Sequence, residues 1–213
     1  MTRQQLSSAT RQHSDSDSDT SYKTATSFHQ FVLSFQWLIT LLPLSLLSPV
    51  PFQGEHNMEI ISVGEHNLNV YLNLAQSYEG EFSGITRKKP NECGLFPLDT
   101  QISDNTKGYL LIIDNTPAGL AAILAKSNNK YEVSEFYIIP YFRKQLFGKH
   151  FAHQLWRMFP GLWEVKQITG ADDASVFWRK VISEFTLGNF LEDKYEDSYW
   201  GLVTRQQFCT VSE

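Results

Sequence analysis

The chain changes from a strand pattern to a helix pattern at Pro140, and no other feature constrains the fold as strongly. Residues 131–139 are rich in aromatic and β-branched side chains and stop at that proline, which favours a strand. From residue 147 onwards, apolar residues recur every three or four positions, as they do on one face of a helix. These residues are Phe147, Phe151, Leu155, Met158 and Phe159. A strand that leads into a helix through a short turn predicts an α/β domain.

The same spacing predicts a helix on either side of this unit. Asn67 is a candidate N-cap for a helix whose apolar face begins at Leu68 and which ends near Gly80. Asp172 or Asp173 is a candidate cap for a second amphipathic helix. The apolar face of that helix contains Ala174, Phe177, Trp178, Val181, Ile182 and Phe185.

Further strands are predicted where apolar, β-branched and aromatic residues run between turn residues. The candidates are residues 109–113, 118–125, 163–168, 191–195 and 199–208. The first two are separated by a short turn and predict a hairpin. The glycines and prolines of residues 82–107 predict a loop.

Residues 1–57 differ in composition from the rest of the chain and form an N-terminal extension. Residues 1–27 are rich in serine and aspartate, contain no apolar period and are predicted to be disordered. Residues 31–50 are uncharged and mostly apolar, and a membrane-spanning helix needs about 20 such residues. This segment is a membrane anchor, a signal peptide or part of a region upstream of a true start at Met58. The long, acidic region before it argues against a signal peptide, and we favour the third interpretation because residues 58–213 have the pattern of a complete domain.

The composition fits a globular domain and excludes several classes of protein. The 213 residues include 14% aromatic side chains and only two cysteines, which excludes collagen-like, fully disordered and disulfide-scaffold chains. The formal charge is −5 and no run of Lys and Arg is longer than residues 87–89, so we expect no nucleic-acid partner. Cys93 and Cys209 have no CxxC spacing and no His neighbour, so neither a metal site nor a disulfide is expected.

The turn that follows Pro140 carries the residues that most suggest chemistry. Arg143, Lys144 and Lys149 surround the predicted start of a helix, and Gly148 lies in its first turn. A first turn presents unpaired backbone N–H groups and the positive end of the helix dipole, which together suit a phosphate or pyrophosphate. An ordinary strand–turn–helix unit with solvated basic residues is the alternative.

This turn also resembles a family motif. The run Arg143-Lys144-Gln145-Leu146-Phe147-Gly148 resembles the acetyl-CoA loop of the GNAT superfamily of N-acetyltransferases, Arg/Gln-x-x-Gly-x-Gly/Ala. The helix start from Ala174 to Ile182 resembles the family's Asn-x-x-Ala-x-x-Phe/Leu-Tyr motif. Residues 78–83, 135–137 and 159–165 resemble a bacterial branch of predicted acetyltransferases. The likeness covers about residues 58–208 and implies a mixed, mostly antiparallel sheet flanked by helices.

The resemblance implies cytoplasmic transfer of an acetyl group from acetyl-CoA to an amine of a small molecule or peptide. Glu135, or as second choice Glu132, would take the proton that the ammonium must lose, and a backbone N–H near Ile138 would polarise the thioester oxygen. The implied cofactor-binding residues are Phe136, Ile138, Arg143, Lys144, Gln145, Leu146, Phe147, Gly148, Lys149, Ala174, Phe177 and Trp178. The implied acceptor-binding residues are Tyr78, Glu79, Glu81 and Phe82, whose carboxylates would suit a cationic amine. A monomer and a homodimer both remain open.

Three residues depart from the family's motifs. Leu146 stands in place of the first glycine, where a side chain can crowd the phosphate or resist a positive φ. Ala171 replaces the asparagine, and Trp178 replaces a tyrosine that protonates the departing thiolate, a role that indole cannot fill. These departures motivate a rival function, a non-catalytic acyl-CoA-binding regulatory module. A membrane-tethered interaction protein, anchored through residues 31–50, is the third possibility.

Overall fold

The computed structural model describes residues 56–126 and 129–211. The predicted disorder of residues 1–27 and the apolar segment 31–50 lie outside the described residues. Within the described ranges, no helix is both long enough and apolar enough to span a membrane.

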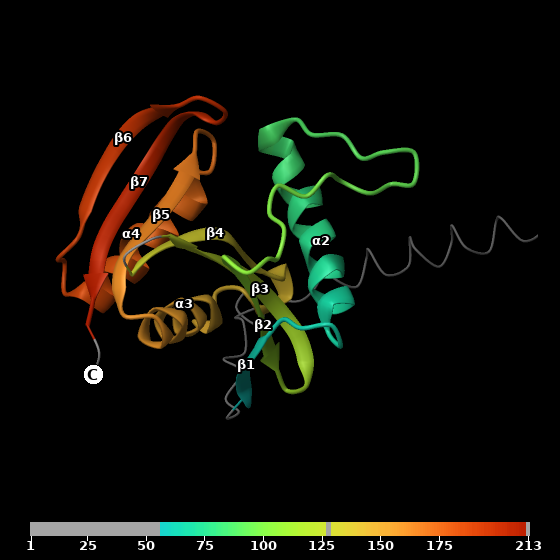
Figure 1. Ribbon diagram of the computed structural model, residues 1–213, viewed down its shortest axis with the longest axis horizontal. Coiled ribbons are helices and arrows are strands. Elements are labelled where there is room, and N and C mark those ends of the chain that lie inside the picture. The colour runs from blue at the N-terminus through green and yellow to red at the C-terminus, as the bar shows by residue number, and fades with distance from the viewer. Residues whose placement is uncertain (1–55, 127–128, 212–213) are drawn as a thin grey trace, which may run out of the picture. The chain divides into compact units, whose positions relative to one another are not determined.

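The described strands form one seven-stranded sheet in the order β1-β2-β3-β4-β5-β7-β6 (Figure 1). They are β1 (Met58–Ser62), β2 (Thr106–Ile113), β3 (Thr116–Lys126), β4 (Lys130–Ile138), β5 (Gly161–Ile168), β6 (Leu191–Asp197) and β7 (Gly201–Thr210). Within the described chain, β4 and β5 are the one parallel pair, and all other neighbours are antiparallel. The mixed, mostly antiparallel sheet that the family resemblance implies is confirmed.

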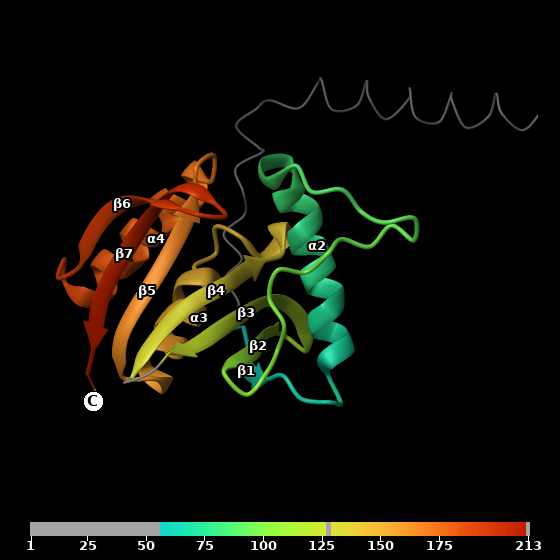
Figure 2. The same cartoon turned by 45° about the horizontal axis from the view of Figure 1, so that its top comes forward.

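Helices cover both faces of this sheet (Figures 1 and 2). Helix α2 (Leu68–Thr86) packs on one face, in a cluster with side chains of β2, β3 and β4. Helices α3 (Phe147–Met158) and α4 (Asp172–Thr186) pack on the other face. A short 3-10 turn, η2 (Pro140–Phe142), lies between β4 and α3.

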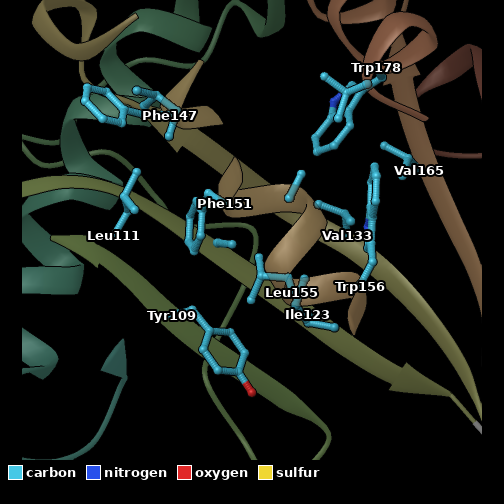
Figure 3. Close-up of a cluster of buried hydrophobic side chains, with 14 of the residues drawn as sticks. Tyr109, Leu111, Ile123, Val133, Phe147, Phe151, Leu155, Trp156, Val165 and Trp178 are labelled. Carbon is cyan, nitrogen blue, oxygen red and sulfur yellow. The ribbon is translucent and has the colours of Figure 1, made fainter. Parts of the chain in front are cut away.

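The larger hydrophobic core lies between the sheet and the pair α3 and α4 (Figure 3). Phe151, Leu155 and Trp156 of α3 are almost fully buried there, in one cluster with Ile123 and Val133 of the sheet. Burying one such side chain stabilises a fold by roughly 1.5–3 kcal/mol. These contacts fix α3 to the sheet, and with it the loop that precedes α3.

The predicted start of α2, with Asn67 at the N-cap position, is confirmed, and its predicted end is wrong. The helix continues past Gly80 to Thr86 and ends where Arg87 takes a left-handed conformation. A single glycine inside a helix costs only about 1 kcal/mol, so Gly80 does not stop it, and residues 82–86 are helical instead of loop. Asn67 does not cap the helix with its side chain, because its Oδ1 accepts a hydrogen bond of 2.8 Å from the Gly64 N–H.

Other differences are smaller. Ala171 is the N-cap of α4, and Asp172 and Asp173 lie in its first turn, where they complement the helix dipole. Met158, predicted on the buried face of α3, is half-exposed at the end of that helix. Strand β1 was not predicted, because its five residues are too few for a clear period. The remaining predicted strands are confirmed to within a few residues.

Candidate active site

Strands β4 and β5 pair over only part of their length and then separate. The parallel ladder ends at Val133 and Val165, whereas β4 continues to Ile138 and β5 to Ile168. Figure 2 shows the two strands diverging. The last part of β4 therefore has an edge that no described strand covers.

A β-bulge lies at the point of separation. In the ladder between β3 and β4, Val133 lies opposite Ile123 and Glu135 lies opposite Ala122, so Ser134 has no partner. The bulge changes which face of the sheet the following side chains occupy. Glu135 consequently lies against α2, although Val133 lies in the core beneath α3 and α4.

The uncovered edge of β4 presents backbone groups to the gap. The Ile139 N–H donates to the Ala118 carbonyl of β3 over 2.9 Å. Because successive residues of a strand turn their backbone groups to opposite sides, those of Phe136 and Ile138 point away from β3. The Arg143 Nε donates to the Ile138 carbonyl over 2.7 Å. The remaining edge groups are the N–H and carbonyl of Phe136 and the N–H of Ile138.

The loop after η2 leads directly to the N-terminus of α3. Lys144 and Leu146 have positive φ angles of 62° and 67°, and the helix begins at Phe147. Leu146 thus takes the left-handed conformation that glycine adopts most readily, and the residue is 56% exposed. The backbone N–H groups of the first helical turn have no acceptor within the helix, and the helix dipole adds positive potential there.

Apart from Arg143, the polar side chains of this loop and of the first turn of α3 make few contacts with other described segments. The Gln145 Nε2 donates to the Tyr141 carbonyl over 2.9 Å, within the loop itself. The Lys149 Nζ lies 3.3 Å from Glu184 Oε2, and Lys144 is exposed. Lys144 and Lys149 therefore bring positive charge to the end of α3 that already favours an anion.

Arg143 joins the loop to α2. Its two terminal nitrogens donate to the two carboxylate oxygens of Glu81, each over 2.8 Å. Its guanidinium also lies over the Tyr137 ring, 5.4 Å from the centroid. Arg143, which the resemblance assigns to cofactor binding, is therefore paired with Glu81, which the resemblance assigns to acceptor binding.

Glu135 is a buried carboxylate, with 4% of its surface exposed. The Tyr71 hydroxyl donates to its Oε2 over 2.8 Å. Burial raises the pKa of Glu135 above its ordinary value, the hydrogen bond from Tyr71 and the nearby hydroxyl of Thr100 oppose this, and the nearby carboxylates of Glu79 and Asp99 raise the pKa further. A carboxylate with a raised pKa is a stronger base than an exposed one.

Glu79 is buried more completely, at 1% exposed, and is paired with Lys88 over 2.8 Å. Lys88 also pairs with Asp99, so its ammonium group forms ion pairs with two carboxylates. Next to them, Tyr78 stacks on Phe82 with ring centroids 5.4 Å apart. All four predicted acceptor residues thus lie on α2, and Tyr71, Lys88, Asp99 and Thr100 are neighbours that sequence reasoning missed.

A hollow of about 350 Å³ lies beside this cluster, between the start of α2 and residues 98–102. Tyr71 and Thr100 are among its lining residues. Its other walls are mainly apolar, from Leu68, Leu98 and Ile102.

Comparisons with known proteins bear on this geometry. No protein-family model matches the chain, and no curated protein sequence matches it. Among solved structures, the ribosomal-protein-S18-alanine N-acetyltransferase from Escherichia coli matches with a TM-score of 0.50 and 10% identity, covering 74% of this chain and 96% of that one. The PaiA N-acetyltransferase from Thermoplasma acidophilum, in complex with coenzyme A, matches with a TM-score of 0.50 and 11% identity, covering 71% and 99%. The chain has the GNAT fold.

Within this GNAT fold, the two candidate bases have different surroundings. Glu135 lies beneath α2, whereas Glu132 lies in an ion-pair network on the sheet surface. The Lys166 Nζ donates to Glu132 Oε2 over 2.9 Å, and Lys126 pairs with the same carboxylate. Glu132 is therefore held by two ammonium groups, and no ammonium group of the described residues pairs with Glu135.

The aromatic residues at the second GNAT motif lie between α3, α4 and β4. Trp178 is buried, and its ring lies 4.8 Å from that of Phe136 (Figure 3 shows Trp178 beside Trp156). Phe177 is half-buried, and a Cβ atom added to Gly148 would lie 3.4 Å from its ring. Trp178 is thus a core residue, while Phe177 borders the first turn of α3.

Proposed function

We propose that this chain is an acetyl-CoA-dependent N-acetyltransferase that acts on an amine of a small molecule or peptide. One observation carries the proposal. The uncovered edge of β4, the N-terminus of α3 and the buried carboxylate of Glu135 meet along the last residues of a single strand.

The residues around the gap fit acetyl-CoA, an extended molecule with amide groups and a pyrophosphate. Phe136 and Ile138 offer backbone groups in the alternation that an added extended segment requires. The first turn of α3, with Lys144 and Lys149, offers N–H groups and positive charge for the pyrophosphate. Phe177 adds an apolar wall. When bound there, acetyl-CoA would supply an acetyl group activated as a thioester.

Glu135 acts as the general base in this proposal. The acceptor arrives as an ammonium ion, because the pKa of an alkylamine is about 10, and its N–H proton passes to Glu135 directly or through a bridging water. The amine nitrogen then forms a bond to the acyl carbon while the carbon–sulfur bond breaks, and the nitrogen loses its second proton to solvent as the amide forms. The Ile138 N–H stabilises the negative charge that develops on the acyl oxygen. Trp178 has no hydroxyl, so the departing thiolate takes its proton from solvent.

The acceptor is expected on the α2 side of β4. Glu79 and Asp99 share a single ammonium group, that of Lys88, so this region has an excess of carboxylates over cations. Tyr78 and Phe82 supply a flat apolar surface beside it. We propose a cationic amine with a short apolar part as the acceptor class.

A second function, an acyl-CoA-binding regulatory module, is favoured by one specific observation. Trp178 is buried in the core where the family motif has a tyrosine, so the chain lacks that proton donor. This module would bind acetyl-CoA without turnover.

Calorimetric titration of the full chain with acetyl-CoA, together with CoA release against a panel of amines, tests the proposal. Lys144→Glu should weaken binding tenfold or more, by about the energy of one charge-assisted phosphate contact, whereas Lys180→Glu, an exposed change on α4, should not. If the chain binds acetyl-CoA and releases CoA when at least one amine is added, the result supports the enzyme. If it binds acetyl-CoA but releases no CoA with any amine of the panel, the result supports the regulatory module. Absence of binding contradicts both.

A further inference from the structure

Tyr71 and Glu135 form a buried pair between α2 and β4. The hydroxyl of Tyr71 donates to Glu135 Oε2 over 2.8 Å, across 64 positions of sequence. The exposed fractions of the two residues are 1% and 4%. Because each residue is anchored on a regular element and packed on all sides, the hydrogen bond holds the carboxylate in one orientation.

The other carboxylate oxygen of Glu135, Oε1, takes no part in this contact. Oε1 has no hydrogen-bond partner among the described residues. Buried polar atoms normally have a partner, so an unpartnered oxygen in this place indicates a site for a proton donor that comes from outside the described chain. A carboxylate is planar, so fixing Oε2 also fixes the direction of Oε1.

Titratable and polar groups from α2 and from the segment between α2 and β2 face Glu135. They are Tyr71, Tyr78, Glu79, Asp99 and Thr100. The two other carboxylates oppose ionisation of Glu135 and are themselves paired with Lys88. The hydrogen bond from Tyr71 acts in the other direction and lowers the pKa of Glu135. Tyr71 therefore stabilises the charged form, which is the form that accepts a proton.

We propose that Tyr71 is a positioning residue for Glu135, fixing its carboxylate so that Oε1 is the atom that receives the proton of the acceptor. This rests on the proposed function, because it assigns the orientation of the base in that reaction. In this step the N–H bond of the ammonium breaks, its electron pair stays on nitrogen, and the proton goes to Oε1 directly or through a bridging water. Tyr71 keeps its own proton, because burial and the neighbouring carboxylate raise its pKa.

The test compares Tyr71→Phe with Tyr109→Phe in the full chain. Both changes remove one hydroxyl from a buried ring, but Tyr109 lies in the other core, beside Phe159, and is not part of the cluster around Glu135. The first readout is the pKa of the Glu135 carboxyl, measured by NMR in protein labelled with ¹³C-glutamate and assigned with Glu135→Gln. The second is the pH profile of kcat/KM for the acceptor.

In Tyr71→Phe, the pKa of Glu135 should rise by about one unit, as loss of one hydrogen bond to a charged group predicts. The acidic limb of kcat/KM should move to higher pH by the same amount, with the KM for acetyl-CoA unchanged. Tyr109→Phe should show neither shift. An unchanged pKa in Tyr71→Phe, or equal shifts in both variants, would overturn the positioning role while leaving the N-acetyltransferase proposal in place. Wild-type protein that acetylates no amine would overturn the proposed function and the role of Tyr71 with it, whatever the NMR titration gives.

Discussion

Val133 and Glu135, separated by one residue of β4, project from opposite faces of the sheet. Val133 lies in the core beneath α3 and α4, and Glu135 accepts a hydrogen bond from Tyr71 of α2. In a regular strand, residues two positions apart share a face, and the bulge at Ser134 removes that constraint. The same bulge lies where β4 separates from β5, so it places a carboxylate beside the gap.

The ionisation of Glu135 should make the protein less stable as the pH rises. Burial raises the pKa of Glu135 above 4.5, its ordinary value, so between the unfolded and folded pKa values the folded state keeps a proton that the unfolded chain has lost. Stability therefore falls through this interval. Glu135→Gln removes the effect, and its free energy of unfolding, measured in urea, should rise relative to wild type as the pH increases above about 4, the ordinary pKa of a glutamate. A difference that does not vary with pH, or that has the opposite sign, contradicts the burial argument.

Removal of the Lys88 ammonium should destabilise the protein. Lys88→Met leaves Glu79, which is 1% exposed, without its cation, and breaking a buried ion pair from one side costs about 3 kcal/mol. Denaturant unfolding measures this cost. Lys89→Met, a change at the neighbouring exposed lysine, should alter stability by less than about 0.5 kcal/mol. The double variant Glu79→Gln with Lys88→Met should recover part of the stability that Lys88→Met loses. Equal losses of stability in Lys88→Met and Lys89→Met would contradict a stabilising ion pair between Glu79 and Lys88.

A matched pair of glycine changes tests how tightly β3 holds the end of β4. A Cβ atom at Gly119 would lie 2.4 Å from the Tyr137 carbonyl oxygen, so Gly119→Ala should lower stability by about 2 kcal/mol or more. Gly84 lies in α2 with nothing within 4 Å of an added Cβ, and Gly84→Ala should raise stability by up to about 1 kcal/mol. Thermal unfolding should shift in opposite directions, and a tolerated Gly119→Ala would contradict the described register.

The parts of the fold that the sequence predicts are those set by local patterns. The strand before Pro140 and the helix from Phe147 follow from side-chain periodicity and a proline, so both are found close to their predicted ends. The end of α2 is missed, because packing in the folded protein outweighs the weak helix propensity of Gly80. The conformation of the loop before α3 is not predictable from the sequence either, because Leu146 adopts a positive φ that a leucine residue disfavours.

The candidate site depends more on contacts between distant segments. Glu135 was selected through the family resemblance, but its burial and its contact with Tyr71 arise from residues 64 positions apart. The pairing of Arg143 with Glu81 is likewise not readable from either segment alone. The resemblance ranks Glu135 above Glu132, and the physical difference between the two carboxylates comes from the bulge and the neighbouring lysines.

The most direct measurement is the rate of CoA release by Glu135→Gln relative to wild type, at saturating acetyl-CoA and with the amine that wild type acetylates. The predicted result is a fall of about a hundredfold or more with an unchanged Kd for acetyl-CoA, because a general base is lost and the cofactor contacts are not. Glu132→Gln, which removes a carboxylate held by two lysines, should retain most of the wild-type rate. A Glu135→Gln protein as fast as wild type would contradict the assignment of Glu135 as the base and the account built on it.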